Sequence, residues 1–258
     1  MTAALTLSGK RGVILGVANS HSIAFGCAKA LADLGAELCI TYVNEKSKPF
    51  VEPLLPELNA PLCLPCDVSV PGAIEALFAQ LEAEWGSLDF VIHSIAWSPL
   101  AELQGRLVDT SAEGFSQAID ISCHSFIRVA SAAEKLMEAN GGTLITMSYY
   151  GSEKVVDHYA MMGPIKAALE SSVRYLAAEL GEKNIRVHTV SPGPMPTRAA
   201  SGISHFDELM DDAVRRSPLH RLGTPDDVGK LVAFLVSDWA TGHTGSQMFV
   251  DAGHHIMA

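Results

Sequence analysis

Short apolar runs alternate with longer helical patterns along the whole chain, and this alternation limits the possible folds more than any other feature. Runs such as VILGV and DFVIHS are apolar throughout, which is typical of strands covered on both faces. We therefore expect an α/β fold, a single-domain Rossmann-like doubly wound parallel sheet of about seven strands. The strand candidates are residues 12–17, 37–42, 62–66, 88–94, 143–148, 185–191 and 247–251, and helical patterns cover 23–34, 73–85 and 226–237.

The chain offers no boundary between domains. No Gly/Ser-rich linker, repeat or low-complexity tract interrupts residues 1–258, so we expect one domain. The least regular stretch, 191–224, opens with SPGPMPT, whose prolines prevent regular structure. A long insertion late in an α/β chain is a functional lid or a disordered loop. Apolar residues at helical spacing over 206–216 favour a lid.

Composition excludes several classes of protein. Hydrophobic residues make up 48% of the chain and charged residues 18%, unlike a disordered protein. No run approaches ~18 uncharged apolar residues, so we expect no transmembrane helix and no membrane partner, and the N-terminus lacks the order of a signal peptide. The chain has 18 Lys and Arg against 29 Asp and Glu, a formal net charge of −11. Without a basic footprint, nucleic acid is not an expected partner.

The cysteines indicate a reducing compartment. They are odd in number and irregularly spaced, which argues against a disulfide framework and favours the cytoplasm. Cys63 and Cys66 form a C-x-x-C, but a zinc site would need two further clustered ligands. No second C-x-x-C and no H-x-x-x-H exists. We therefore expect no metal and interpret both cysteines as residues of a short strand.

The turn after the first strand is the expected phosphate end of a binding site. Gly16, Ser22 and Ile23 lie where a dinucleotide fold places its pyrophosphate against a helix N-terminus. The G-x-G-x-x-G fingerprint is absent, so position along the chain carries this prediction. The alternative is an ordinary strand-to-helix turn capped by Ser20 or Ser22.

The ends of the second and third strands bear on the choice of cofactor. An acidic residue after the second strand holds a ribose 2′-hydroxyl, whereas an Arg accepts a 2′-phosphate. Val43 ends this strand, no Arg follows, and Glu45 adds negative charge, which favours NADH over NADPH. Lys46 and Lys48 leave NADPH open as the alternative. After the third strand, Asp67 can accept a hydrogen bond from an adenine amino group or cap the next helix.

The reacting end is expected after the fifth strand. Tyr159 and Lys166 stand seven residues apart, nearly two helical turns, so on one helix both would project from the same face. An ammonium beside a phenol would lower the pKa of that phenol from about 10 and help it to supply a proton. The alternative is a surface Tyr and Lys. If the helix begins near Gly163, Pro164 is harmless but the spacing argument weakens.

The order of elements resembles the short-chain dehydrogenase/reductase superfamily. Its usual Tyr-x-x-x-Lys signature is missing, because Gly163 stands four residues after Tyr159. The chain instead resembles a divergent branch, the enoyl-acyl carrier protein reductases of type II fatty acid synthesis, in which two tyrosines stand ten residues apart and a lysine follows seven beyond. Tyr149, Tyr159 and Lys166 match that pattern. Other matching stretches are 16–18 with 22–24, 66–68, 93–96, 162–163 and 198–203, and the resemblance runs from Leu7 to about Ala252.

The resemblance implies roles for individual residues. Tyr159 would stabilise an enolate oxygen, Lys166 would orient the cofactor through its ribose, and Tyr149, also assigned as catalytic, would line the acyl pocket. Ser98, with Tyr149 and Tyr159, would contact the substrate. The implied cofactor-binding residues are Gly16, Ser22, Ile23, Val43, Asp67, Val68, Ser94, Ile95, Lys166, Met195, Pro196 and Thr197.

The implied activity is NADH-dependent reduction of a trans-2-enoyl group on acyl carrier protein, by a homotetramer that contacts itself through the helices flanking the fifth strand. Two alternatives remain: a reductase of a ketone or of a substrate not bound to a carrier, and a dinucleotide sensor without catalysis. The chain departs from the family at Val43, Glu45, Trp97 and Pro192, and Tyr150 leaves open which tyrosine of the tandem pair faces the pocket. Arginines near the lid could dock an acidic carrier or pair with nearby carboxylates: Arg198, Arg215, Arg216 and Arg221.

Overall fold

The computed structural model describes residues 4–198 and 200–257. Ala199, part of the matched stretch 198–203, lies outside the described residues. The strands form one parallel sheet in the order β3-β2-β1-β4-β5-β6-β7, so the predicted doubly wound sheet of seven strands is confirmed. The strands are β1 (Arg11–Leu15), β2 (Glu37–Tyr42), β3 (Leu62–Pro65), β4 (Phe90–His93), β5 (Gly142–Met147), β6 (Ile185–Pro192) and β7 (Gln247–Val250).

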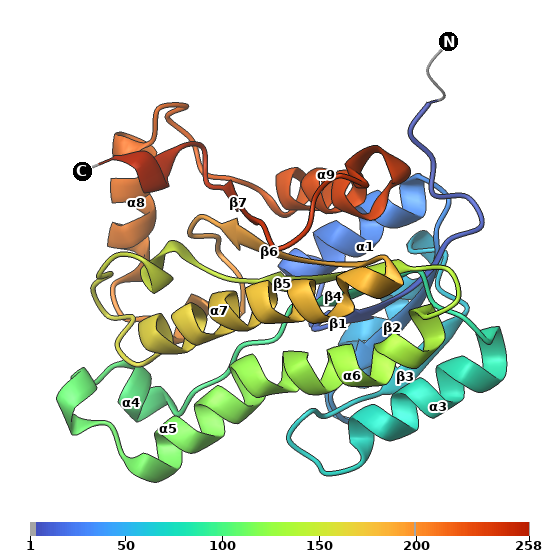
Figure 1. Ribbon diagram of the computed structural model, residues 1–258. Coiled ribbons are helices and arrows are strands. Elements are labelled where there is room, and N and C mark those ends of the chain that lie inside the picture. Colours follow the sequence, from blue (N-terminus) through green and yellow to red (C-terminus); the bar gives the residue numbers. More distant parts are fainter. Residues whose placement is uncertain (1–3, 199, 258) are drawn as a thin grey trace.

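Helices cover both faces of this sheet (Figure 1). The pair α1 (Ile23–Asp33) and α9 (Pro225–Val236) packs on one face, and α3 (Ala73–Trp85), α6 (Ser125–Met137) and α7 (Met162–Leu180) pack on the other. Alternate residues of one strand therefore enter two different cores: Val13 lies in one and Ile14 in the other. This double burial explains why the strands are apolar throughout.

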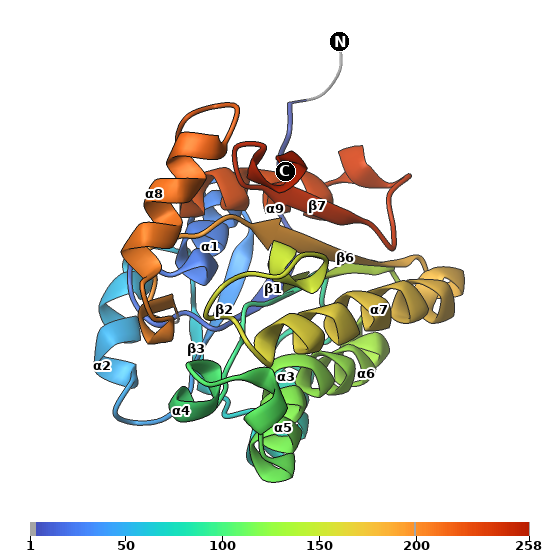
Figure 2. The same cartoon turned by 90° about the vertical axis from the view of Figure 1, so that its left-hand side faces the viewer.

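Shorter helices lie between these main elements along the chain. They are α2 (Lys48–Val51), α4 (Leu100–Leu103), α5 (Ala112–Ile119), the π-helix η3 (Asp120–His124) and α8 (Phe206–Arg216). The helix predicted over 206–216 is confirmed as α8. Figure 2 views the molecule from the side on which α8 and α4 lie, with α8 above and α4 below.

The chain reverses its winding between β1 and β4, which are neighbours although β2 and β3 separate them in sequence. The connection after β1 leads to α1 on one face, and the segment after β4 leads to α5 and α6 on the other. A crevice forms at the carboxyl ends of the strands at such a switch point, and ligands of open α/β sheets bind there.

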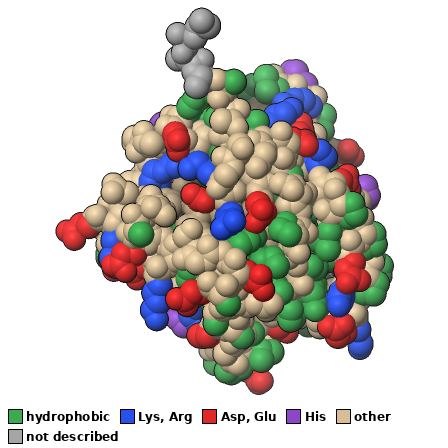
Figure 3. Space-filling view, turned by 90° about the vertical axis from the view of Figure 1, so that its right-hand side faces the viewer, with side chains coloured by type: hydrophobic (Ala, Val, Ile, Leu, Met, Phe, Trp, Pro, Cys, Tyr) green, Lys and Arg blue, Asp and Glu red, His purple; other side chains and the backbone are tan. Residues whose placement is uncertain are grey.

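Charged side chains at the opposite, amino edge of the sheet pair with one another. Lys10 lies 3.3 Å from Asp238, and Arg11 lies 3.4 Å from Glu37. On the face in Figure 3, acidic and basic side chains are interspersed. Among the described residues, no helix is both long enough and apolar enough to span a bilayer.

The helices α1 and α9 touch through two glycines. A Cβ atom added at Gly229 would lie 2.3 Å from the carbonyl oxygen of Gly26, and one added at Gly26 would lie 2.3 Å from the Pro225 carbonyl oxygen. Both obstacles are backbone atoms, so a methyl group at either position has to separate the helices. The contact depends on the absence of side chains.

We predict that Gly229→Ala lowers the free energy of unfolding by about 1–3 kcal/mol, because the methyl group overpacks a backbone contact. Urea denaturation at fixed protein concentration measures this. Gly181→Ala is the control, since its added Cβ meets nothing within 4 Å and the change is neutral or stabilising by up to about 1 kcal/mol. Equal effects of the two substitutions would contradict the prediction.

Candidate active site

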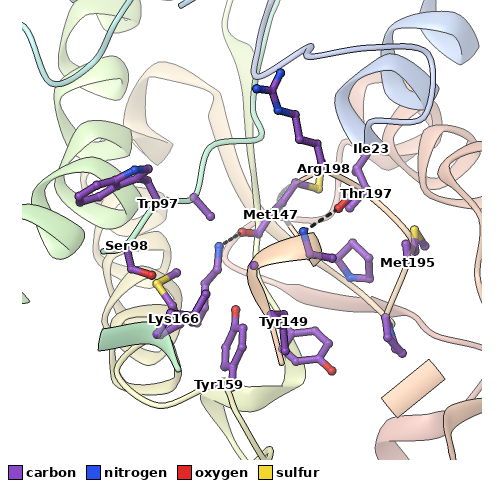
Figure 4. A pocket seen from close by; sticks show the side chains of 18 of the residues that line it. Ile23, Trp97, Ser98, Met147, Tyr149, Tyr159, Lys166, Met195, Thr197 and Arg198 are labelled. Atoms are coloured by element: carbon purple, nitrogen blue, oxygen red, sulfur yellow. Dashed lines mark hydrogen bonds between the residues drawn. The ribbon is translucent and has the colours of Figure 1, made fainter. Parts of the chain in front are cut away.

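A cavity of about 410 Å³ opens at the carboxyl edge of the sheet. Ligand pockets have volumes of this order. Residues at or just after the ends of β4, β5 and β6 line it, together with residues of α4 and the first residue of α8. Figure 4 shows Lys166, Tyr159 and Tyr149 among the lining side chains. The structure brings into its wall these predicted site residues: Ile23, Ser94, Ile95, Ser98, Tyr149, Tyr159, Lys166, Met195 and Thr197.

The remaining predicted residues lie at the same edge but outside this wall. Pro196 lines a neighbouring cavity of about 330 Å³. Val43 follows β2 and is 50% exposed, and Asp67 and Val68 follow β3. The other two residues, Gly16 and Ser22, lie between β1 and α1.

Lys166 is 4% exposed and projects from α7 toward the end of β5. Its ammonium donates a hydrogen bond of 2.7 Å to the Met147 carbonyl oxygen. Burial lowers the pKa of Lys166 to about 8, and the charges of Glu170 and Cys123 oppose this change. The side chain therefore places an ammonium that can lose its proton near pH 8 in the wall of the cavity.

Tyr159 lies outside α7, which begins at Met162. The predicted placement of Tyr159 and Lys166 on one helical face is therefore wrong. Two flanking residues, His158 (φ 61°) and Ala160 (φ 36°), are left-handed, so a tight turn presents Tyr159 instead. Pro164 stands in the first turn of α7, where its missing N–H leaves no helical hydrogen bond unmade.

The electrostatic prediction for Tyr159 is also wrong. Burial, with a smaller contribution from the Glu170 carboxylate, raises the pKa of this phenol. Only 9% of Tyr159 is exposed, and the ammonium of Lys166 is bonded to the Met147 carbonyl. The phenol consequently keeps its proton at neutral pH.

The structure also separates the tandem tyrosines. Tyr149 lines the cavity, and its ring centroid lies 4.9 Å from that of Tyr159. Tyr150 packs instead against His254, with ring centroids 5.1 Å apart. Burial raises the pKa of Tyr149 as well. Two neutral phenols, Tyr149 and Tyr159, therefore share one end of the cavity.

The expected phosphate end has the geometry of a helix N-terminus. Ser22 is the N-cap of α1, and its hydroxyl accepts a hydrogen bond of 3.3 Å from the Phe25 N–H. Gly16 (φ 105°) approaches Ser94 so closely that an added Cβ would lie 2.1 Å from the Ser94 carbonyl oxygen. The turn therefore packs closely against the residue after β4, and the N-terminus of α1 begins at the carboxyl edge of the sheet.

At the end of β2, the charged residues bond among themselves. Tyr42 donates a hydrogen bond of 3.2 Å to Glu45, and the ammonium of Lys48 lies 3.5 Å from Glu52. Lys48 also lies over the Tyr42 ring, 5.5 Å from its centroid. These contacts link Lys48 to Glu52, just after its own helix, and to the Tyr42 ring at the end of β2.

The end of β3 is held by a turn and by an arginine. Asp67 accepts hydrogen bonds from the backbone and hydroxyl of Ser69, so it stabilises a turn rather than capping α3. The Arg128 guanidinium donates to the Val68 carbonyl oxygen at 3.0 Å. Both contacts order the loop predicted to hold adenine.

The C-x-x-C places two thiols at β3. Cys63 is partly buried, and burial raises the pKa of Cys66 to about 11. Among residues 4–198 and 200–257, no group of three or more His, Cys, Asp or Glu side chains could hold a metal ion.

The arginines near the lid pair with carboxylates. Arg215 and Arg216 both bond to Asp212, and Arg221 lies 2.7 Å from Asp227. Of the two interpretations left open by the sequence, internal pairing accounts for these three arginines.

Several cavity residues escaped the sequence analysis. Ile203 and Phe206, within the stretch 191–224, and Met147, the last residue of β5, line the wall. Their positions were predictable from the expected lid and strand end. Trp97, which the sequence already singled out as a departure from the family pattern, lines the cavity too. Its backbone N–H donates to the Ser122 hydroxyl, and that hydroxyl donates to the Trp97 carbonyl oxygen, both at 2.8 Å. That contact joins residues 25 apart, and no local pattern indicates it.

An open parallel sheet with a Tyr and a Lys at its switch-point cavity defines an α/β reductase of the short-chain dehydrogenase/reductase type. Residues 16–255 match the family model described as enoyl-(acyl carrier protein) reductase. The enoyl-acyl-carrier-protein reductase (NADH) 1 of Rhizobium meliloti is 48% identical over 97% of this chain and 92% of its own length. The chain therefore belongs to the enoyl-(acyl carrier protein) reductase family, as the sequence resemblance predicted.

Solved structures agree with this assignment. The Anaplasma phagocytophilum reductase in complex with NAD is 50% identical, with a TM-score of 0.94 over 97% of this chain and 95% of that chain. The Bacillus cereus reductase with NADP+ and an indole naphthyridinone is 42% identical, with a TM-score of 0.95 over 98% of each chain.

Proposed function

We propose that this protein reduces the double bond of a trans-2-enoyl group carried on acyl carrier protein, with NADH as hydride donor, in fatty acid elongation. The observation that carries the proposal is the neutral phenol of Tyr159 and the buried ammonium of Lys166 in one cavity at the switch point. Membership of the family and the NADH specificity in the names of several relatives support it.

The described residues fit a dinucleotide. The N-terminus of α1 offers backbone N–H groups for a pyrophosphate, and Gly16 keeps side-chain atoms away from the approach to β4. Ser22 and Ile23 would hold the pyrophosphate, and Asp67 and Val68 the adenine. At the other end, the proposed contacts are Ser94, Ile95, Met195, Pro196 and Thr197 on the nicotinamide half, with Val43 beside the adenine ribose.

The cofactor, when bound, supplies the hydride. Tyr159 would hold a proton at its phenol oxygen and donate a hydrogen bond to the thioester oxygen, where negative charge develops as the β-carbon is reduced. Lys166 would bind the ribose hydroxyls, and its bond to Met147 fixes where its ammonium lies. Tyr149 would pack beside Tyr159 and exclude water from this oxygen.

The acyl chain would lie between Ser98 and the lid. Apolar side chains of the lid segment face the cavity at Ile203 and Phe206. We infer that 191–224 forms a substrate lid within one reductase domain, residues 1–258. Closure of such a lid would shield the reacting atoms from water.

NADH is favoured over NADPH by the end of β2. Glu45 is held near the strand end by Tyr42, and Lys48 is held by Glu52 and the Tyr42 ring. A 2′-phosphate would meet a carboxylate there rather than a guanidinium.

We also infer a homotetramer in the cytoplasm. An exposed apolar residue on α7, Tyr175, is 70% accessible in the single chain and would be covered by a second copy along α6 and α7. The thiols Cys27, Cys39, Cys63, Cys66 and Cys123 are all free, in keeping with a reducing compartment.

The activity is tested by following the loss of NADH absorbance with crotonyl thioesters on carrier protein and on coenzyme A, against a panel of ketones. We expect the enzyme to reduce the carrier-bound enoyl thioester and to reduce none of the ketones. Preference for a ketone would refute the proposal.

We predict that Tyr159→Phe lowers turnover of the enoyl thioester by on the order of 100-fold or more, because one hydrogen-bond donor to the developing oxyanion is lost. The ring remains, so NADH affinity, measured by fluorescence titration, stays close to that of the wild type. Wild-type turnover by this variant would remove Tyr159 from the mechanism.

Lys166→Met is expected to weaken NADH binding by about 10- to 100-fold, since the ammonium makes charge-assisted hydrogen bonds that the thioether cannot. In the wild type, affinity should fall as the pH rises through about 8, where the ammonium loses its proton. Calorimetry without substrate, from pH 6 to 10, checks both points. Unchanged affinity in the variant would mean that Lys166 does not contact the cofactor.

Glu45→Arg should narrow the preference for NADH over NADPH, because it removes a repulsive carboxylate and adds a guanidinium that can bind a 2′-phosphate. The measurement is kcat/KM with each cofactor. Glu182→Arg, on the amino side of β6, makes the same change of charge and should leave the ratio unaltered. A wild-type preference for NADPH would show that Lys46 or Lys48 reaches the phosphate.

A further inference from the structure

Glu170 is a buried carboxylate that the proposed reaction does not use. It stands on α7 one helical turn after Lys166 and is only 6% exposed. It does not line the cavity, so it does not contact a bound substrate. A charged carboxylate in such a place is destabilising unless it is partnered.

The carboxylate is bonded to the end of β5. Its Oε1 accepts a hydrogen bond from the Ser148 hydroxyl, and Ser148 stands between Met147, which accepts from Lys166, and Tyr149, which lines the cavity. Two side chains one turn apart on α7 thus hold consecutive residues of one strand end. One bond goes to the backbone and the other to a side chain.

The charges around Lys166 come from several elements. The carboxylate of Glu170 and the thiol of Cys123, on η3, both favour its ammonium. His93 on β4 is buried, and burial lowers its pKa to about 3, so it is neutral. Tyr159 is a neutral phenol, and the charge of Glu153, after β5, raises the pKa of Glu170. Burial raises the pKa of Cys123 too, so its thiol is neutral near pH 7. Burial also raises the pKa of Glu170, whereas the hydrogen bond from Ser148 and the ammonium of Lys166 favour its carboxylate form.

We infer that Glu170 is a positioning residue of this site: its carboxylate holds the end of β5 through Ser148 and supplies the negative charge that keeps the Lys166 ammonium protonated. The inference rests on the proposed function, because it assigns the ammonium a task in binding NADH. It predicts that the charge of Glu170, rather than its size, determines the pH range in which the cofactor binds.

The experiment is NADH affinity as a function of pH for the wild type and Glu170→Gln. The amide keeps the size and a hydrogen bond to Ser148 but removes the charge. We expect the alkaline loss of affinity to move down by about one pH unit, from near pH 8 toward pH 7. An unchanged midpoint would overturn the inference.

Two matched variants separate charge from structure. Ser148→Ala removes the hydrogen bond to Glu170 and keeps the charges of Glu170 and Lys166. It should therefore lower the affinity for NADH without changing the pH at which half of that affinity is lost. Glu179→Gln removes an exposed carboxylate from the same helix and should change neither. If either variant moves the midpoint as far as Glu170→Gln, a specific role for the Glu170 charge is refuted.

Stability supplies a second, independent readout. In Lys166→Met, Glu170 is left as a buried charge without its cation, so Lys166→Met/Glu170→Gln should have a higher urea midpoint than Lys166→Met alone. A lower midpoint would overturn the coupling, even where Glu170→Gln alone does not fold. A wild type that binds no NADH at any pH would refute the proposed function, whereas this comparison would still decide the coupling.

Discussion

The buried hydrogen bond between the Lys166 ammonium and the Met147 carbonyl connects α7 to the end of β5, and the candidate site depends on it. Removing an ammonium from water costs several kcal/mol unless partners replace the lost hydration. The end of a parallel strand supplies such partners, because its last carbonyl groups have no further ladder to join. The same contact links α7 to the strand end that leads into Tyr149, and Tyr149 and Tyr159 line the one cavity with Lys166.

Much of the fold follows from the local pattern of the sequence. The predicted ranges 37–42, 73–85 and 206–216 agree with β2, α3 and α8 at both ends. Other ends differ by one or two residues, for example β1, which stops at Leu15 because Gly16 turns with φ 105° toward β4. The edge that holds the cavity was also predictable, because the carboxyl ends of parallel strands at a switch point form a crevice whatever their side chains.

The inner geometry of the site was not predictable in this way. His158 and Ala160 adopt left-handed conformations that their residue types do not signal, so the sequence pattern placed Tyr159 on a helix that begins three residues later. The bond between Ser148 and Glu170 joins residues 22 apart and exists only once β5 and α7 have packed. The pKa of Tyr159 depends on burial by the whole fold, which is why spacing to Lys166 predicted the wrong direction.

Burial has opposite consequences for the protons of Tyr159 and Lys166. It favours the neutral form of each, which keeps the proton on the phenol of Tyr159 but tends to remove one from the ammonium of Lys166. The carboxylate of Glu170 raises the pKa of both groups. It therefore adds to the rise that burial causes in the pKa of Tyr159 and opposes the fall that burial causes in the pKa of Lys166. One negative charge behind the cavity thus favours the protonated form of both side chains, and a neutral phenol and a cation stand in the same wall.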